Sequence, residues 1–122
     1  MNVEHIGVYA NDSAALGAWY AEALQMREID RIGKEGRPPV VFLQGEQGAV
    51  VEILPTDAAR EGRDLKSPGF THLGIPVDDM EGEIERLAGL GVEVWGVRST
   101  SNGWTIGYFH DPEGNILELI QR

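Results

Sequence analysis

Residues 3–8 read Val-Glu-His-Ile-Gly-Val, and residues 70–75 read Phe-Thr-His-Leu-Gly-Ile. Both stretches follow the pattern apolar, any residue, His, aliphatic, Gly, aliphatic. The same offset of 67 positions that separates the two stretches separates His5 from His72. A fixed offset between similar segments is the signature of an internal repeat. We therefore predict two copies of one structural module.

Each copy continues with a pattern typical of an amphipathic helix. Candidate N-cap residues precede each helix, Asp12 and Ser13 in the first copy and Asp78 and Asp79 in the second, because their side-chain oxygens can accept hydrogen bonds from free backbone N–H groups. Asp12 and Asp79 are again 67 positions apart. Apolar residues then recur at the three- and four-residue spacing of one helix face. These residues are Leu16, Trp19, Tyr20, Ala23 and Leu24 in the first copy and Met80, Ile84, Leu87 and Ala88 in the second.

Each copy ends with an apolar strand that carries a glutamate in its middle. Residues 49–54 read Ala-Val-Val-Glu-Ile-Leu, and residues 115–120 read Asn-Ile-Leu-Glu-Leu-Ile. Glu52 and Glu118 are 66 positions apart, one fewer than the other pairs, as a single loop deletion would produce. Two further strands fit between helix and glutamate strand in each copy, near 27–32, 40–43, 92–97 and 104–109.

The order of these elements predicts an α+β fold made of two tandem βαβββ modules. We expect a single domain over residues 1–122, with a first module at about 1–57 and a second at about 70–122. The segment at about 55–69 is rich in charge, Gly and Pro and is predicted to be the linker.

Composition excludes several classes of protein. The chain has no cysteine, so any metal site must use nitrogen and oxygen ligands. The formal net charge of -10 argues against binding to the phosphates of nucleic acid. No apolar run approaches the roughly 20 residues that cross a bilayer, and the first residues do not resemble a signal peptide. We predict a cytoplasmic protein with a small-molecule substrate and no nucleic-acid or membrane partner.

The duplicated polar residues predict a metal site. Side chains alternate between the faces of a strand, so His5 shares a face with Gly7, and His72 with Gly74. Glu52 and Glu118 have apolar neighbours on both faces of their strands. A buried carboxylate without a partner is costly, and a divalent cation would be a partner that all four side chains can share.

The alternatives to a metal site are ordinary structural roles. A single histidine in an apolar strand is usually a hydrogen-bonded core residue, and a single glutamate usually lies at a solvated edge. Two of each at equivalent positions favour a shared metal ion bound by His5, Glu52, His72 and Glu118. This ligand set suits Zn, Ni, Co, Mn or Fe(II), and four protein ligands leave two positions on an octahedral ion.

The closing sequence adds a resemblance to a known family. Residues 111–118, Asp-Pro-Glu-Gly-Asn-Ile-Leu-Glu, together with Trp19-Tyr20 and both His-x-Gly segments, resemble the vicinal-oxygen-chelate superfamily of glyoxalases, bleomycin-resistance proteins and dioxygenases. The resemblance spans nearly the whole chain. It implies paired modules whose curved sheets enclose a metal cavity. It also implies a homodimer, in which the site is often built from modules of two subunits.

Within that superfamily the chain most resembles glyoxalase I, or lactoylglutathione lyase, whose ligands are His, Glu, His and Glu at these four places. The resemblance implies a metal-dependent lyase or isomerase that acts on a hemithioacetal-like adduct through an enediolate. Glu118 is the candidate catalytic base, with Glu52 as its opposite number. Tyr9 and Thr56 replace an arginine and an asparagine that usually hold glutathione, and Gln25 stands where a glycine commonly ends the first helix.

Other branches of the superfamily remain alternatives. Extradiol dioxygenases share Tyr108 and the closing motif but have an upstream histidine where this chain has Ser-Asn-Gly at 101–103, and only His110 is nearby. Epimerases differ more at Glu52, and fosfomycin-type thiol transferases need a cationic cluster that an acidic chain lacks. Bleomycin-resistance-type proteins bind drugs without catalysis and generally lack the ligands. Four aromatic residues would line a pocket or fill a core in any of these: Tyr9, Phe42, Trp95 and Trp104.

Overall fold

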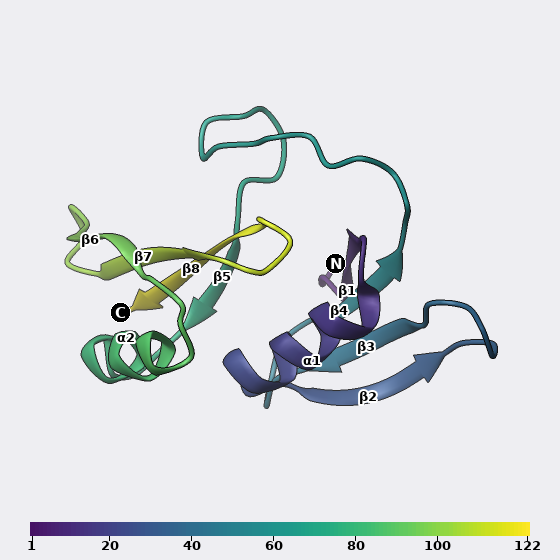
Figure 1. Cartoon of the computed structure of the whole chain (residues 1–122). Helices are drawn as coiled ribbons and strands as arrows, with labels where there is room; N and C mark the ends of the chain where they lie inside the picture. Colours follow the sequence, from purple (N-terminus) through teal and green to yellow (C-terminus); the bar gives the residue numbers. More distant parts are fainter. The chain divides into compact units, whose positions relative to one another are not determined.

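The computed structural model describes all residues from Met1 to Arg122 and divides into two units, Met1–Arg60 and Glu61–Arg122 (Figure 1). Each unit contains one helix and one four-stranded sheet of mixed direction in the order β-α-β-β-β. The predicted α+β fold with two βαβββ modules is therefore confirmed. The division between the units falls inside the segment that we predicted to be the linker.

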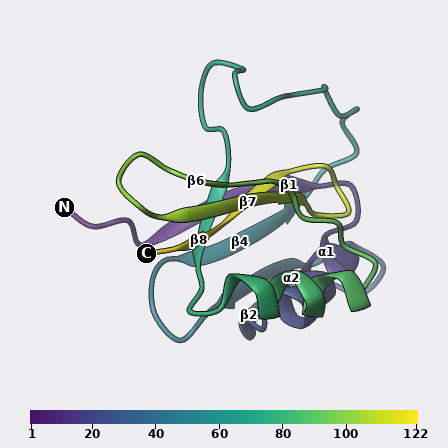
Figure 2. The same ribbon diagram turned by 90° about the vertical axis from the view of Figure 1, so that its left-hand side faces the viewer.

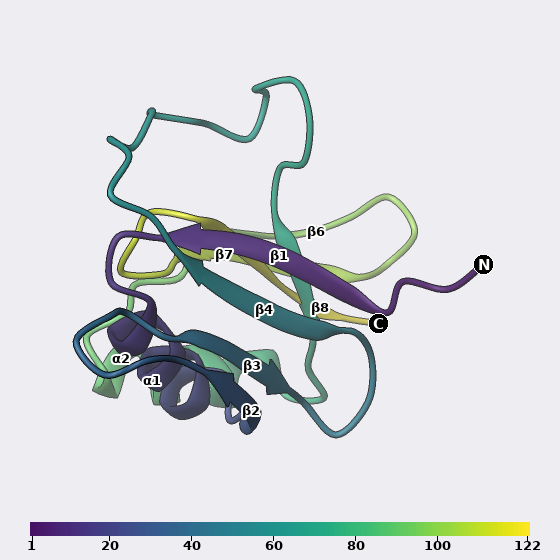
Figure 3. The ribbon, with the colours of Figure 1, turned by 90° about the vertical axis from the view of Figure 1, so that its right-hand side faces the viewer.

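The first module has its strands in the spatial order β1-β4-β3-β2 (Figure 3). Strands β1 and β4 are far apart in the sequence but pair in parallel. The pairs β4-β3 and β3-β2 are antiparallel. Strand β1 is therefore an edge strand beside the glutamate strand β4. The elements are β1 (His5–Ala10), α1 (Ser13–Ala23), β2 (Arg27–Ile32), β3 (Val40–Gln44) and β4 (Val50–Pro55).

The second module repeats this arrangement with the order β5-β8-β7-β6. Figure 2 shows β7 between β6 and β8. Strand β5 is parallel to the glutamate strand β8, and β8-β7 and β7-β6 are antiparallel. The topology of the repeat predicted from the sequence is thus the same in both halves. The elements are β5 (Leu73–Pro76), α2 (Met80–Gly89), β6 (Trp95–Ser99), β7 (Thr105–His110) and β8 (Ile116–Gln121).

Of the candidate N-cap residues, Asp12 caps α1 and Asp79 caps α2. The Asp12 carboxylate accepts a hydrogen bond from the Ala15 backbone N–H at 3.0 Å, and that of Asp79 accepts one from Gly82 at 3.1 Å. Each bond satisfies a donor that the helix itself leaves free. The helix ends differ, because α1 is followed by Gln25 at a φ of 54° and α2 by Gly91 at a φ of 79°.

In each module one face of the sheet carries the core, and the other face is here called the open face. In the first module the alternating residues Val41, Leu43, Val51 and Ile53 are buried on the side of α1. In the second, Phe109, Leu117 and Leu119 are the equivalent core residues. Because the side chains of a strand alternate, Glu52 and Glu118 lie on the open faces.

Three details differ from the sequence expectations. The strand expected at 92–97 is β6 at Trp95–Ser99, because a bulge between Trp95 and Arg98 shifts its pairing with β7. His72 lies one residue before β5 rather than within it. Ala88, expected on the buried face of its helix, is exposed. None of the helices is both long and apolar enough to pass through a membrane.

Candidate metal centre

The first module brings His5 and Glu52 together on its open face. Glu52 of β4 pairs with Gly7 of β1, and His5 lies two residues before Gly7 on the same side of the strand. The His5 Nε2 atom lies 3.6 Å from Glu52 Oε2. The imidazole is about half exposed and the carboxylate is 23% exposed. Two of the four predicted ligands therefore lie side by side on one face of this module.

The second module brings His72 and Glu118 together in the same way. Glu118 of β8 pairs with Gly74 of β5, and His72 precedes Gly74 by two residues. The His72 Nε2 atom lies 3.4 Å from Glu118 Oε2, and the Glu118 side chain is only 12% exposed. We call each His–Glu pair a half-site. The second half-site is the more buried of the two, because both of its side chains are less exposed than their counterparts.

The other nitrogen of each imidazole is held by the preceding residue. His5 Nδ1 contacts the Glu4 carboxylate, and His72 Nδ1 lies 2.5 Å from the Thr71 hydroxyl oxygen. The hydrogen bond and the charge of Glu4 raise the pKa of His5, and Glu52 adds a smaller effect in the same direction. A histidine that binds a metal through Nε2 is commonly oriented by such a contact at Nδ1. Both imidazoles therefore direct Nε2 toward a glutamate.

An aromatic residue lies on the other side of each glutamate. Phe42 of β3 pairs with Glu52, and Tyr108 of β7 pairs with Glu118. Burial raises the pKa of Tyr108, and the charge and hydrogen bond of Glu118 raise it further. The phenol therefore stays protonated at neutral pH and donates to the carboxylate. Sequence reasoning treated Tyr108 only as a dioxygenase motif residue and missed this contact, although the repeat alignment with Phe42 could have revealed it.

The closing motif forms a turn that fixes the start of β8. The buried Asp111 carboxylate accepts hydrogen bonds from the backbone N–H groups of Glu113 and Asn115, both at 2.9 Å. The Asn115 side-chain amide donates to the same carboxylate at 2.7 Å. Gly114 has a φ of 84°, which favours glycine. This network is structural, and it serves the site by positioning the strand that carries Glu118.

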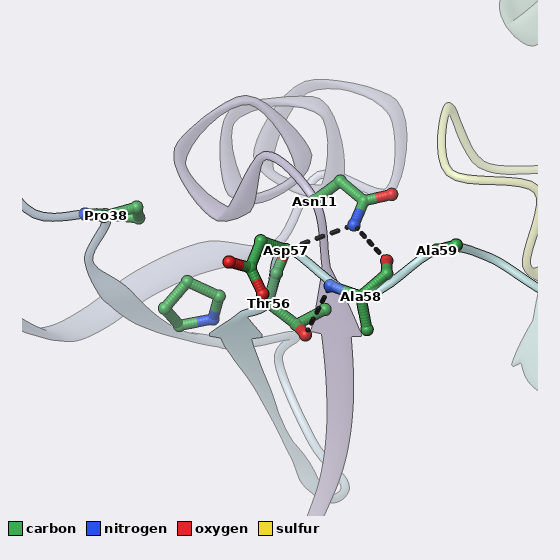
Figure 4. A pocket seen from close by; sticks show the side chains of 7 residues that line it. Asn11, Pro38, Thr56, Asp57, Ala58 and Ala59 are labelled. Carbon is green, nitrogen blue, oxygen red and sulfur yellow. Dashed lines mark hydrogen bonds between the residues drawn. The ribbon is translucent and has the colours of Figure 1, made fainter.

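A hollow of about 650 Å³ lies at the carboxyl ends of β1 and β4 in the first module (Figure 4). Asn11 lines this hollow, and its side-chain amide donates to the carbonyl oxygens of Thr56 at 3.1 Å and Ala58 at 2.9 Å. An adjoining hollow of about 280 Å³ is lined by Tyr9 and Thr56. These are the two positions where the chain departs from the glutathione-binding pattern.

The remaining aromatic candidates have different surroundings. Trp95 lies on the open face of the second module, with its ring centre 5.1 Å from that of Tyr108. The Arg122 guanidinium lies 4.5 Å from the centre of the Trp104 ring, a cation–π contact that is a structural role. Tyr9 is 66% exposed and lines the smaller hollow.

The donor chemistry of the two half-sites fits a divalent transition metal. Each offers one imidazole nitrogen and one carboxylate, and the two together would supply the predicted set of His5, Glu52, His72 and Glu118. Neither module by itself gathers three or more side chains of the types that bind metals. The four-ligand centre therefore stays a prediction, as do the metal cavity and the homodimer.

Comparison with known proteins identifies the family. The model of the Glyoxalase/Bleomycin resistance protein/Dioxygenase superfamily matches residues 2–119. The chain belongs to this superfamily. The curated protein YwbC of Bacillus subtilis is 26% identical over 128 residues, covering 98% of this chain and 97% of that protein. YwbC is itself named as an uncharacterized protein, so its similarity indicates no activity for this chain.

Two solved structures illustrate the similarity of the fold. A glyoxalase family protein from Enterococcus faecalis has a TM-score of 0.81 at 23% identity and covers 97% of this chain and 95% of its own. A lactoylglutathione lyase from Agrobacterium tumefaciens has a TM-score of 0.72 at 20% identity, covering 98% of this chain and 92% of its own. At these identities the similarity shows the fold alone.

Proposed function

We propose that the protein is a divalent-metal-dependent lyase or isomerase of the glyoxalase I type. One observation carries the proposal: equivalent positions of the two modules present a His–Glu half-site, with Nε2–Oε2 distances of 3.6 and 3.4 Å. Each half-site directs one imidazole nitrogen toward one carboxylate, and this donor set suits a divalent transition metal. We propose that His5, Glu52, His72 and Glu118 bind one Zn, Ni, Co, Mn or Fe ion.

The reaction that suits this ligand set is proton transfer between adjacent carbons of a small carbonyl adduct. The bound ion would hold two vicinal oxygens of the adduct and stabilise the negative charge of the enediolate. Glu118 is the proposed base, because it is the less exposed glutamate and Tyr108 orients its carboxylate. Glu52, the equivalent glutamate of the first module, pairs with Phe42 and has no such hydrogen-bond donor.

The thiol part of the adduct is proposed to differ from glutathione. The exposed Tyr9 and the neutral Thr56 line the small hollow at the end of β1 and β4. Neither supplies a cation for a glutathione carboxylate, and the cation that lines this hollow is Arg60, in the segment that follows β4. The replacement of the usual arginine and asparagine by Tyr9 and Thr56 therefore carries this part of the proposal.

The test is turnover of methylglyoxal premixed with a panel of thiols, by protein loaded in turn with each of the five metals. We expect formation of a thioester with at least one metal and a thiol other than glutathione. The control is the His5→Ala, His72→Ala double variant, which should be inactive. Absence of turnover with every metal and thiol, with ligand binding retained, would favour the alternative of a non-catalytic binding protein.

A second experiment asks whether one chain or two build the site. Inactive His5→Ala and His72→Ala variants are mixed, unfolded and refolded together. If a site uses one module from each of two subunits, mixed dimers regain activity at up to one of their two sites. If each chain carries its own complete site, the mixture stays inactive.

A further inference from the structure

The open faces of the two modules match position by position around their glutamates but differ on the outer strand. At the level of the glutamate the first module has Asp30 beyond Phe42, and the second has Trp95 beyond Tyr108. Two residues further along, the first module has Ile32 and the second has Arg98. At this position of the outer strand, only the second module has a cation, and only the second module has an indole ring at the level of its glutamate.

Arg98 is poorly explained as a structural residue. It is the sole arginine or lysine in the four strands of the second module, and it forms no ion pair with a carboxylate. In a chain with a net charge of -10, an unpaired guanidinium on this face is unusual. Arg98 pairs with Ile106 of β7, two residues before Tyr108, and therefore lies on the same face as Tyr108. Glu118 raises the pKa of the Tyr108 hydroxyl and Arg98 acts to lower it, so both charged groups act on this phenol.

A row of aromatic rings extends from the half-site across the open face to the outer strand that carries Arg98. His72 meets the edge of Tyr108, with ring centres 5.7 Å apart, and Trp95 lies 5.1 Å beyond Tyr108. His110 stacks on Trp95 at 5.7 Å with 23° between the ring planes. The Nε1 atom of Trp95 is buried without a hydrogen-bond partner, so its own hydrogen bonding does not explain its place in this row.

We propose that Arg98 is a specificity-determining residue that binds a carboxylate of the substrate, while a planar part of the substrate lies against Trp95 and Tyr108. This rests on the proposed function, because it assumes that the reacting oxygens lie at the His72–Glu118 half-site. A carboxylate is favoured over a phosphate because the planar guanidinium fork matches a carboxylate and one cation suits a single negative charge. Adjacent strands lie roughly 4.8 Å apart, so β6 lies about 10 Å from β8, within reach of a substituted phenyl group.

The test compares two probes with vicinal oxygens that differ only in charge, 4-(hydroxyacetyl)benzoate and 4-(hydroxyacetyl)benzamide. Their dissociation constants are measured on the full chain by two-dimensional NMR titration, following the Trp95 Nε1–H signal, which the wild type and both variants retain. We expect the benzoate to bind about fivefold more tightly, a modest factor because Arg98 is solvent-exposed. The Arg98→Gln variant should bind both probes equally. Equal binding of both probes to the wild type would overturn the proposal.

The matched control is Arg27→Gln, which removes an exposed arginine from the open face of the first module. This variant should still bind the benzoate more tightly than the benzamide. Loss of the preference in both variants would indicate a general charge effect and overturn the proposal. Turnover of the matching substrates, 4-carboxyphenylglyoxal and phenylglyoxal with a thiol, separates the role of Arg98 from the proposed function. Turnover without a carboxylate preference would refute the role of Arg98 alone. An Arg98-dependent preference in a protein without turnover would support the subsite and refute the proposed function.

Discussion

The two modules share a fold and a half-site, but the second surrounds its half-site with more protein. The carboxylate of Glu52 is 23% exposed and pairs across the sheet with Phe42, whereas that of Glu118 is 12% exposed and accepts a hydrogen bond from Tyr108. His5 is held by a charged neighbour and His72 by a hydroxyl. In the proposed function the duplication would supply the metal ligands, and the divergence between the copies supports Glu118 of the second module as the base.

The largest expected effect comes from replacing each glutamate with its amide. Glu118→Gln should lower kcat by about a hundredfold or more, because a positioned base contributes about that much, and metal should still bind. Glu52→Gln should cost less, because that carboxylate has no Tyr108-like donor. Steady-state kinetics and metal content are measured for both variants. A larger loss for Glu52→Gln would reverse the assignment, and full activity of Glu118→Gln would refute it.

A second contrast lies between Gly107 of β7 and Gly74 of β5, two glycines on the strands that pair with β8. A side chain at Gly107 would approach Val94 Cγ1 to 2.8 Å on the core side, whereas one at Gly74 would meet no atom within 4 Å. Gly107→Ala should therefore lower the free energy of unfolding by about 1–3 kcal/mol, and Gly74→Ala should leave it nearly unchanged. Urea denaturation checks both. Equal losses of unfolding free energy in the two variants would contradict the open space beside Gly74.

The repeat, the caps and the glutamate strands could be read from the sequence because each depends on local patterns. The offset of 67 positions and the N-cap residues Asp12 and Asp79 predicted both modules correctly. The bounds of β6 were wrong because the bulge between Trp95 and Arg98 depends on pairing with β7 and on Gly96, whose φ is 64°. Local periodicity does not reveal such a bulge.

For the candidate site, the sequence singled out His5, Glu52, His72 and Glu118 but did not predict how they pair or what surrounds each pair. His5 with Glu52 follows from strand alternation once β1 and β4 are adjacent. The contact of Tyr108 with Glu118 and Arg98 depends on the register of three strands, including the bulged one. The pairwise register across a sheet is a tertiary property, and single-strand patterns do not specify it.

The helix ends provide a third and smaller contrast. Gln25 follows α1 in the left-handed region at a φ of 54°, and Gly91 follows α2 at 79°. A residue with a side chain is strained there by roughly 1 kcal/mol, and glycine is not. Gln25→Gly should raise the free energy of unfolding by about that amount, and Gly91→Ala should lower it similarly. Thermal unfolding measures both changes, and destabilisation by Gln25→Gly would contradict the assigned strain.

The smallest expected effect concerns the contact between Glu4 and His5. The carboxylate raises the pKa of His5, so Glu4→Gln should lower that pKa. Since only neutral imidazole binds a metal, the variant should keep its metal to lower pH than the wild type. NMR titration of the metal-free protein measures the pKa, with Thr71→Ala as the control that should leave His5 unaffected. An unchanged pKa in Glu4→Gln would show that the contact does not persist in solution.

The most direct test of the central claim is the metal content per site in the wild type, His5→Ala and Glu118→Ala proteins, measured by elemental analysis. If the half-sites bind one shared ion, the wild type contains one transition-metal ion per pair of half-sites, and each substitution removes nearly all of it. Two ions per pair of half-sites, with each variant losing only the ion of its own module, would contradict the shared centre. A wild-type protein that takes up none of the five metals would contradict the metal-dependent function itself.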